Sequence, residues 1–144
     1  MLLAEDHPRT VEELRKLLES EFEVAAVVGD GHALLRAAET IAHDVVVSDI
    51  SMPGLDGIAA TCALLARRPG SRVVLVTVHD DPEMVARGYA AGALAYVMKL
   101  TASTDLVPAV RTALRGERHR TPNSRLGGET SDPPGSGSRG GSAR

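Results

Sequence analysis

The stretch VVVSDISMPGLDG, residues 45–57, decides the fold class of this chain. Its apolar run at residues 45–48 is typical of a strand buried on both faces, because such a strand has no solvent-facing side. The run stops on the carboxylate of Asp49, and Pro53 and Gly54 then turn the chain. A buried strand that ends in this way places its acid at the rim of a sheet.

Similar runs recur along the chain and alternate with segments of helical period. Strands are predicted at residues 1–4, 22–28, 45–48, 72–76 and 95–98. Pro8 and the pair Asp81-Pro82 favour helix starts, while Gly92 favours a helix end. Five strands alternating with five helices predict an α/β fold with a doubly wound parallel sheet. The flavodoxin-like (βα)5 order 2-1-3-4-5 fits best.

Composition restricts the classes of function. A chain of 144 residues corresponds to a single domain, and its net charge of -3 provides no overall basic field for nucleic acid. Cys62 is the only cysteine, so no disulfide or cysteine-based zinc site can form within the chain. No apolar stretch approaches the ~20 residues of a membrane span, and no signal peptide precedes the first strand. These features predict a cytoplasmic protein with no membrane contact.

The chain changes character after Gly116. Residues 121–144 are dominated by Gly, Ser and Pro, with Leu126 as the one large apolar residue. Such a segment buries too little surface to offset its ordering entropy. We therefore predict a domain at residues 1–117 and a disordered tail at residues 118–144.

Polar side chains follow four of the predicted strands. Glu5-Asp6, Asp49, Thr77 and Lys99 all stand where an apolar run ends. Taken singly, each has an ordinary explanation as a solvated acid, a turn residue or a surface lysine. Together they predict one site, since the carboxyl ends of parallel strands share one edge of the sheet.

The chemistry expected at this edge is phosphoryl transfer. Clustered carboxylates repel one another, and hard oxygen ligands favour Mg²⁺ over softer metals. A carboxylate beside the metal can act as a nucleophile toward phosphorus. Lys99 can neutralise charge on the transferring oxygens while Thr77 donates a hydrogen bond. The predicted product is an aspartyl phosphate on Asp49.

These motifs together resemble the receiver domain of bacterial two-component response regulators. The resemblance covers residues 1 to about 120 and includes the segment Met52-Pro53-Gly54-Leu55-Asp56-Gly57. Ala4-Glu5-Asp6-His7-Pro8 and Gly92-Ala93 before Tyr96 are similar to the NarL/FixJ branch. Members of that branch usually add a LuxR-type helix-turn-helix domain, and none follows Gly116 in this sequence.

The resemblance implies a role for each residue of the site. Asp49 would accept phosphate from a sensor histidine kinase, and Lys99 would contact Asp49 or its phosphate. The expected Mg²⁺ ligands are Asp6, Asp49 and the Ser51 backbone carbonyl, with Glu5 acting mainly through water.

The resemblance also implies a conformational switch. Thr77 would move toward the phosphoryl group and Tyr96 would turn inward behind it. This coupling would alter the face of the fourth helix, fifth strand and fifth helix, where a homodimer or a downstream protein could bind. Ser51 and His79 would lie at the mouth of the site, where they would either tune dephosphorylation or be plain loop residues.

Two positions depart from the pattern of the family. Leu100 follows the lysine where many receivers have proline, so the loop is expected to have a different shape. Pro108 falls inside the predicted fifth helix and is expected to kink it.

Three functions remain open from the sequence. The first is a receiver that acts alone as a phosphorylation-dependent signalling switch, without direct DNA binding. The second is a LuxR-type transcriptional regulator that has lost its DNA-binding half. The third is a phosphatase with an aspartyl nucleophile, but the haloacid-dehalogenase pattern requires a second Asp where Ser51 stands. The first interpretation implies no enzyme activity beyond self-catalysed phosphotransfer to Asp49 and its dephosphorylation.

Overall fold

The computed structural model describes residues 1–119 and contains one parallel sheet of the predicted type. Its strand order is β2-β1-β3-β4-β5, which confirms the flavodoxin-like prediction. The strands are β1 (Leu2–Ala4), β2 (Ala26–Val28), β3 (Val46–Asp49), β4 (Val73–Thr77) and β5 (Ala95–Met98). The helices are α1 (Pro8–Glu19), α2 (Gly31–Thr40), α3 (Gly57–Arg67), α4 (Pro82–Ala90) and α5 (Ala102–Leu114), with a 3₁₀ turn η1 (Lys99–Thr101).

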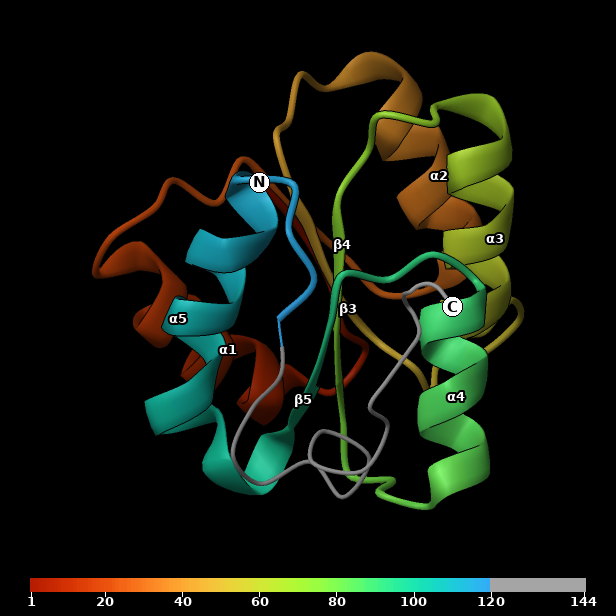
Figure 1. The fold of residues 1–144 in the computed structure, drawn as a ribbon. Coiled ribbons are helices and arrows are strands. Elements are labelled where there is room, and N and C mark those ends of the chain that lie inside the picture. Colours follow the sequence, from red (N-terminus) through yellow and green to blue (C-terminus); the bar gives the residue numbers. More distant parts are fainter. Residues whose placement is uncertain (120–144) are drawn as a thin grey trace.

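Helices cover both faces of the sheet. Helices α1 and α5 lie on one side, and α2, α3 and α4 lie on the other (Figure 1). Strand β4 contributes side chains to both layers. Val73 and Leu75 lie in the core on the side of α2, α3 and α4, whereas Val74 and Val76 lie in the core on the side of α1 and α5. Alternation of side chains along a strand explains this division, and both layers are mainly aliphatic.

Helix starts follow the capping chemistry read from the sequence. Pro8 occupies the first turn of α1, and Pro82 occupies the first turn of α4. The Asp81 side chain accepts a hydrogen bond from the Met84 N–H, as predicted for an N-cap. Asp56 caps α3 in the same way, which fixes where the chain re-enters the fold after the β3 loop.

Some of the predicted strands differ in extent from the observed ones. Strand β2 covers Ala26–Val28 rather than residues 22–28. The Phe22 N–H donates to the Leu18 carbonyl at 2.7 Å, so this residue closes the end of α1 instead of entering the sheet. Asp49 and Thr77 are the last residues of β3 and β4 rather than the residues that follow them.

Other expectations meet the structure only in part. Helix α5 runs from Ala102 to Leu114 as one helix with Pro108 inside it. Leu100 lies in η1 with 92% of its surface exposed. Arg118 and His119, which were assigned to the tail, contact the domain. The rest of the predicted disordered tail, residues 120–144, lies outside the described residues. Within residues 1–119, no helix is long and apolar enough to cross a membrane.

Candidate functional site

The polar residues singled out in the sequence surround the carboxyl edge of the sheet, at the bottom of Figure 1. Strands β1 and β3 pair in parallel with Ala4 opposite Ser48. The next residues on the two chain segments, Glu5 after Ala4 and Asp49 after Ser48, are therefore neighbours. Strands β4 and β5 pair with Thr77 opposite Met98, which brings Lys99 to the same edge. The register of the sheet therefore assembles side chains that are up to 94 positions apart in the sequence.

Three carboxylates form the centre of the site. One oxygen from each of Glu5, Asp6 and Asp49 lies within 4.8 Å of the other two. Glu5 and Asp49 are 2% and 4% exposed, whereas Asp6 is open to solvent. Buried carboxylates this close repel one another, and a hard divalent cation would relieve that repulsion.

Lys99 provides the positive charge next to these acids. Its Nζ lies 3.1 Å from Asp49 Oδ2 and 2.9 Å from Glu5 Oε1. Burial alone would lower the pKa of Lys99, but its close contact with the Glu5 carboxylate and the charge of Asp49 raise that pKa above the ordinary value. The ammonium therefore stays charged and bridges the two buried carboxylates.

Glu5 is the carboxylate of the cluster whose charged form has unfavourable surroundings. Burial raises its pKa, and the charge of Asp49 adds to that rise, while Lys99 and the His7 N–H oppose it. Its Oε2 accepts from the His7 N–H at 3.1 Å. Its Oε1 is fully buried and lacks a well-aligned hydrogen bond, although the Lys99 ammonium is close enough to form an ion pair. An oxygen left in this state fits a site that also accepts a metal ion or a bound water.

Ser51 is exposed on the loop after β3, and its N–H lies 3.4 Å from Asp49 Oδ1. Its hydroxyl lies 3.0 Å from His79 Nε2, so the loops after β3 and β4 meet at the mouth of the site. This contact between Ser51 and His79 was not predicted, although both residues were placed at the mouth.

Thr77 and Tyr96 lie one layer behind the acids. Thr77 is fully buried, and its hydroxyl accepts a hydrogen bond from the His79 N–H at 3.2 Å. The Tyr96 hydroxyl donates to the His79 carbonyl at 2.7 Å, and Tyr96 is 2% exposed. His79 thus joins the two residues that were expected to act as a switch.

Sequence reasoning also missed two other contacts around this site. The first is the ion pair between Lys99 and Glu5, because Lys99 was expected to contact Asp49 alone. The second is the packing of Tyr96 on Tyr89 of α4, whose ring centroid lies 6.5 Å away. The adjacency of Glu5 and Asp49 in register could have indicated the first. The helical position of Tyr89 gave no comparable signal for the second.

A parallel five-stranded sheet with an acidic pocket, a lysine and a buried threonine at its carboxyl edge is the arrangement that the sequence predicted for a signalling domain. The chain belongs to the family described as response regulator receiver domain, which matches residues 1–111. Members of this family are signalling proteins rather than classical enzymes, and they interact with sensor kinases.

Individual relatives belong to the same branch. The chain is 34% identical over 117 residues to the uncharacterized transcriptional regulatory protein YxjL of Bacillus subtilis, covering 80% of this chain and 54% of the relative. It is 32% identical over 122 residues to the response regulator UvrY of Escherichia coli, covering 83% of this chain and 56% of the relative. The chain therefore spans little more than half the length of these relatives.

Solved structures agree with the fold. A LuxR-family two-component response regulator from Aurantimonas is 30% identical, with a TM-score of 0.83 over 88% of this chain and 91% of the other. The signal receiver domain of the putative response regulator NarL from Mycobacterium tuberculosis is 29% identical, with a TM-score of 0.76 over 81% of this chain and 95% of the other. Both likenesses agree with the NarL/LuxR branch inferred from the sequence.

Proposed function

We propose that Asp49 is the phosphoacceptor of this receiver domain and that a sensor histidine kinase supplies the phosphoryl group. The observation that carries the proposal is the pair of contacts that Lys99 makes with Asp49 and Glu5 beside Asp6. Asp49 combines a buried carboxylate, a fixed ammonium and a nearby acidic pocket. Glu5 shares these features, but its second oxygen is held by the His7 N–H at 3.1 Å, whereas Asp49 Oδ1 has only the longer contact of 3.4 Å with the Ser51 N–H.

The acidic pocket is proposed to hold Mg²⁺ through Asp6, Asp49 and the Ser51 backbone carbonyl, with Glu5 acting through water. The donor set consists of oxygen atoms, and the buried Glu5 Oε1, which has the Lys99 ammonium beside it but no well-aligned hydrogen bond, suits a site that gains a partner on binding. When bound, the ion supplies charge neutralisation for the phosphoryl oxygens.

The residues of the chain account for the transfer step. An Asp49 oxygen attacks phosphorus as the bond from phosphorus to the kinase histidine nitrogen breaks, and that nitrogen keeps the electron pair. Lys99 stays protonated and moves part of its contact from Asp49 to the phosphoryl oxygens. The Thr77 hydroxyl turns from the His79 N–H toward the phosphoryl group, which alters what holds Tyr96.

The consequence is a signalling switch rather than a catalytic cycle. Tyr96 links the site to the surface formed by α4, β5 and α5, which we call the α4–β5–α5 face. We propose that this face binds a second copy or a downstream protein. The protein is proposed to act in the cytoplasm, where its kinase and Mg²⁺ are available.

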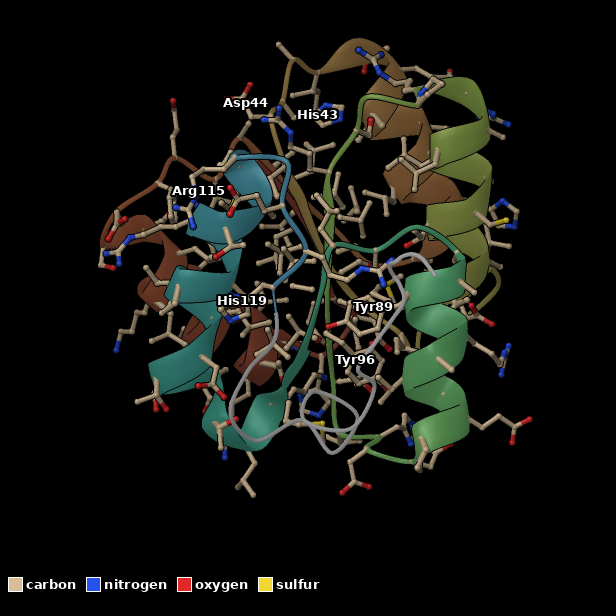
Figure 2. All side chains as sticks on the ribbon, in the orientation of Figure 1. His43, Asp44, Tyr89, Tyr96, Arg115 and His119 are labelled. Atoms are coloured by element: carbon tan, nitrogen blue, oxygen red, sulfur yellow. The ribbon has the colours of Figure 1, made fainter. Side chains whose placement is uncertain are left out.

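The test is labelling with acetyl phosphate and Mg²⁺, followed by intact-protein mass measurement. The natural chain should gain the mass of one phosphoryl group, and Asp49→Asn should gain none. Asp44→Asn is the matched control, because Asp44 is an exposed acid at the opposite edge of the sheet (Figure 2). Labelling that persists in Asp49→Asn would show that another residue is the acceptor.

Two other functions can be separated by direct assays. The interpretation as a regulator that has lost its DNA-binding half is tested with promoter DNA. Specific binding of that DNA in a gel shift would overturn the stand-alone interpretation. A phosphatase predicts steady turnover of a phosphoester, whereas the switch predicts a single labelling event per chain. No contact among residues 1–119 favours either of these over the switch.

A further inference from the structure

The chain turns back on itself after α5. Gly116 adopts a φ of +76°, a left-handed conformation that glycine tolerates best. The Gly116 N–H donates to the Ala113 carbonyl, and the Glu117 N–H donates to the Thr112 carbonyl. This pair of bonds is the Schellman arrangement that ends helices. It directs residues 117–119, which we call the strap, away from the axis of α5.

The strap is held by contacts with α4, with α5 and with Leu94, the residue before β5. The His119 N–H donates to the Leu94 carbonyl at 2.7 Å, and the Tyr89 hydroxyl donates to the His119 carbonyl at 3.0 Å. His119 Nδ1 lies 3.1 Å from the Thr112 hydroxyl. The Arg118 guanidinium lies 4.8 Å from the centre of the Tyr89 ring, within cation–π range. Both backbone groups of His119 are therefore satisfied by the domain.

The strap lies beside the open edge of the sheet. Strand β5 is the last strand of the sheet and pairs only with β4, so its other side is an open edge. Leu94 immediately precedes β5, and the strap runs beside this edge between α4 and α5 (Figure 1). The strap therefore lies over the α4–β5–α5 face.

A continuous set of contacts joins the strap to the proposed phosphorylation site. The Thr77 hydroxyl holds the His79 N–H, and the His79 carbonyl holds the Tyr96 hydroxyl. The Tyr96 ring packs on Tyr89, which in turn holds His119. Figure 2 shows Tyr89 and Tyr96 together beside α4, with His119 across from them next to α5.

We propose that the strap covers the α4–β5–α5 face while Asp49 is unphosphorylated, and that phosphorylation loosens it through Tyr96 and Tyr89. This inference rests on the proposed function of Asp49. When Thr77 turns toward the phosphoryl group, His79 loses a bond, Tyr96 loses its fixed acceptor, and the Tyr89 ring loses the neighbour that positions it. The strap is thus a segment of the chain itself that competes with protein partners for this face.

The test uses the full chain, with beryllofluoride and Mg²⁺ as a stable phosphoryl analogue. Amide resonances next to Asp49 report occupancy of the site, and hydrogen exchange of the His119 amide reports the strap. We expect His119 exchange to speed up at least about fivefold at saturation, the lower end of typical coupling between sites.

The two readouts separate the possible failures. A saturating shift of the amides beside Asp49 with unchanged His119 exchange would overturn the strap inference and leave the proposed function intact. Absence of any shift beside Asp49 would overturn the proposed function, and the strap inference with it.

Tyr89→Phe tests the coupling from the other direction, because it removes one hydroxyl and keeps the ring. Loss of one neutral hydrogen bond should speed His119 exchange roughly two- to tenfold before any analogue is added. Coupling is reciprocal, so beryllofluoride affinity should rise by up to the same factor.

Thr104→Val is the matched control for Tyr89→Phe. Thr104 lies in α5, but its hydroxyl bonds to the Thr101 carbonyl at 3.1 Å and does not touch the strap. A Tyr89→Phe protein with faster His119 exchange but the same beryllofluoride affinity as Thr104→Val would refute the coupling.

Discussion

Gly57→Ala is the sharpest test of how the fold positions Asp49. A Cβ on Gly57 would lie 2.0 Å from the Asp49 carbonyl oxygen and 2.9 Å from both the Asp49 carbonyl carbon and the Ile50 Cα. All three are backbone atoms, so no side-chain rotation can relieve the contact. The Gly57 N–H also donates to the Ile50 carbonyl at 2.8 Å, which ties the start of α3 to the end of β3.

The expected loss of stability follows from these distances. Overpacking a closely packed site costs about 1–3 kcal/mol, and a contact with fixed backbone belongs at the upper end. Replacing glycine by alanine returns about 0.4–1 kcal/mol through the unfolded chain. The net loss is therefore about 2 kcal/mol. With a urea m-value of about 1–3 kcal/mol/M, the unfolding midpoint should fall by roughly 1 M.

Gly70→Ala is the control, because a Cβ there meets nothing within 4 Å. Its midpoint should stay unchanged or rise slightly. Equal midpoints for the two variants would refute the close approach of α3 to β3. Gly57→Ala should also slow acetyl phosphate labelling while leaving every polar side chain of the site in place. Unchanged labelling in a destabilised protein would mean that α3, rather than Asp49, absorbs the displacement.

Two further variants test the site and the residue behind it. Lys99→Ala leaves Glu5 and Asp49 as buried like charges, so without Mg²⁺ the variant should be less stable than the natural chain by up to about 3 kcal/mol. Adding Mg²⁺ should increase the free energy of unfolding more in the variant than in the natural chain, which urea unfolding with and without Mg²⁺ checks. Equal Mg²⁺ effects would contradict the role of Lys99 as the counter-charge. Burial and the charges of Asp81 and Asp80 raise the pKa of Tyr96 above its ordinary 10.0, because they favour the neutral phenol in the folded protein. The stability that this preference contributes is fully present below pH 10 and is lost as the pH rises above it. The free energy of unfolding should therefore fall more between pH 9 and pH 11 in the natural chain than in Tyr96→Phe, and parallel losses would contradict it.

The sequence predicts the fold well where its patterns are strong. Continuous apolar runs located β1, β3, β4 and β5 to within a residue or so, because a strand buried on both faces has no other composition available. The edge strand β2 was predicted too long, since its half-buried residues carry a weaker pattern. Phe22 looked like a strand residue, but its backbone is used to end α1.

The candidate site was predictable in its members and not in its pairings. Position at a strand end places Glu5, Asp49 and Lys99 at one edge for topological reasons alone. The register of β1 and β3 brings Glu5 and Asp49 together, but whether Lys99 contacts one acid or both also depends on its rotamer and on the η1 turn. The strap was hidden for a different reason: His119 is held mainly through its backbone, and backbone contacts leave little trace in the identity of a residue.

Charge explains why Lys99 can affect both the stability of the unphosphorylated protein and its proposed change on phosphorylation. The pocket sets the carboxylates of Glu5, Asp6 and Asp49 against the ammonium of Lys99, so it retains negative charge that a divalent cation can offset. In the proposed reaction the phosphoryl group adds further negative charge at Asp49. Lys99 is then drawn toward the phosphoryl oxygens and leaves Glu5 more dependent on the cation. The same redistribution gives Thr77 a new acceptor, so a local change of charge becomes a change in what His79 and Tyr96 hold in place.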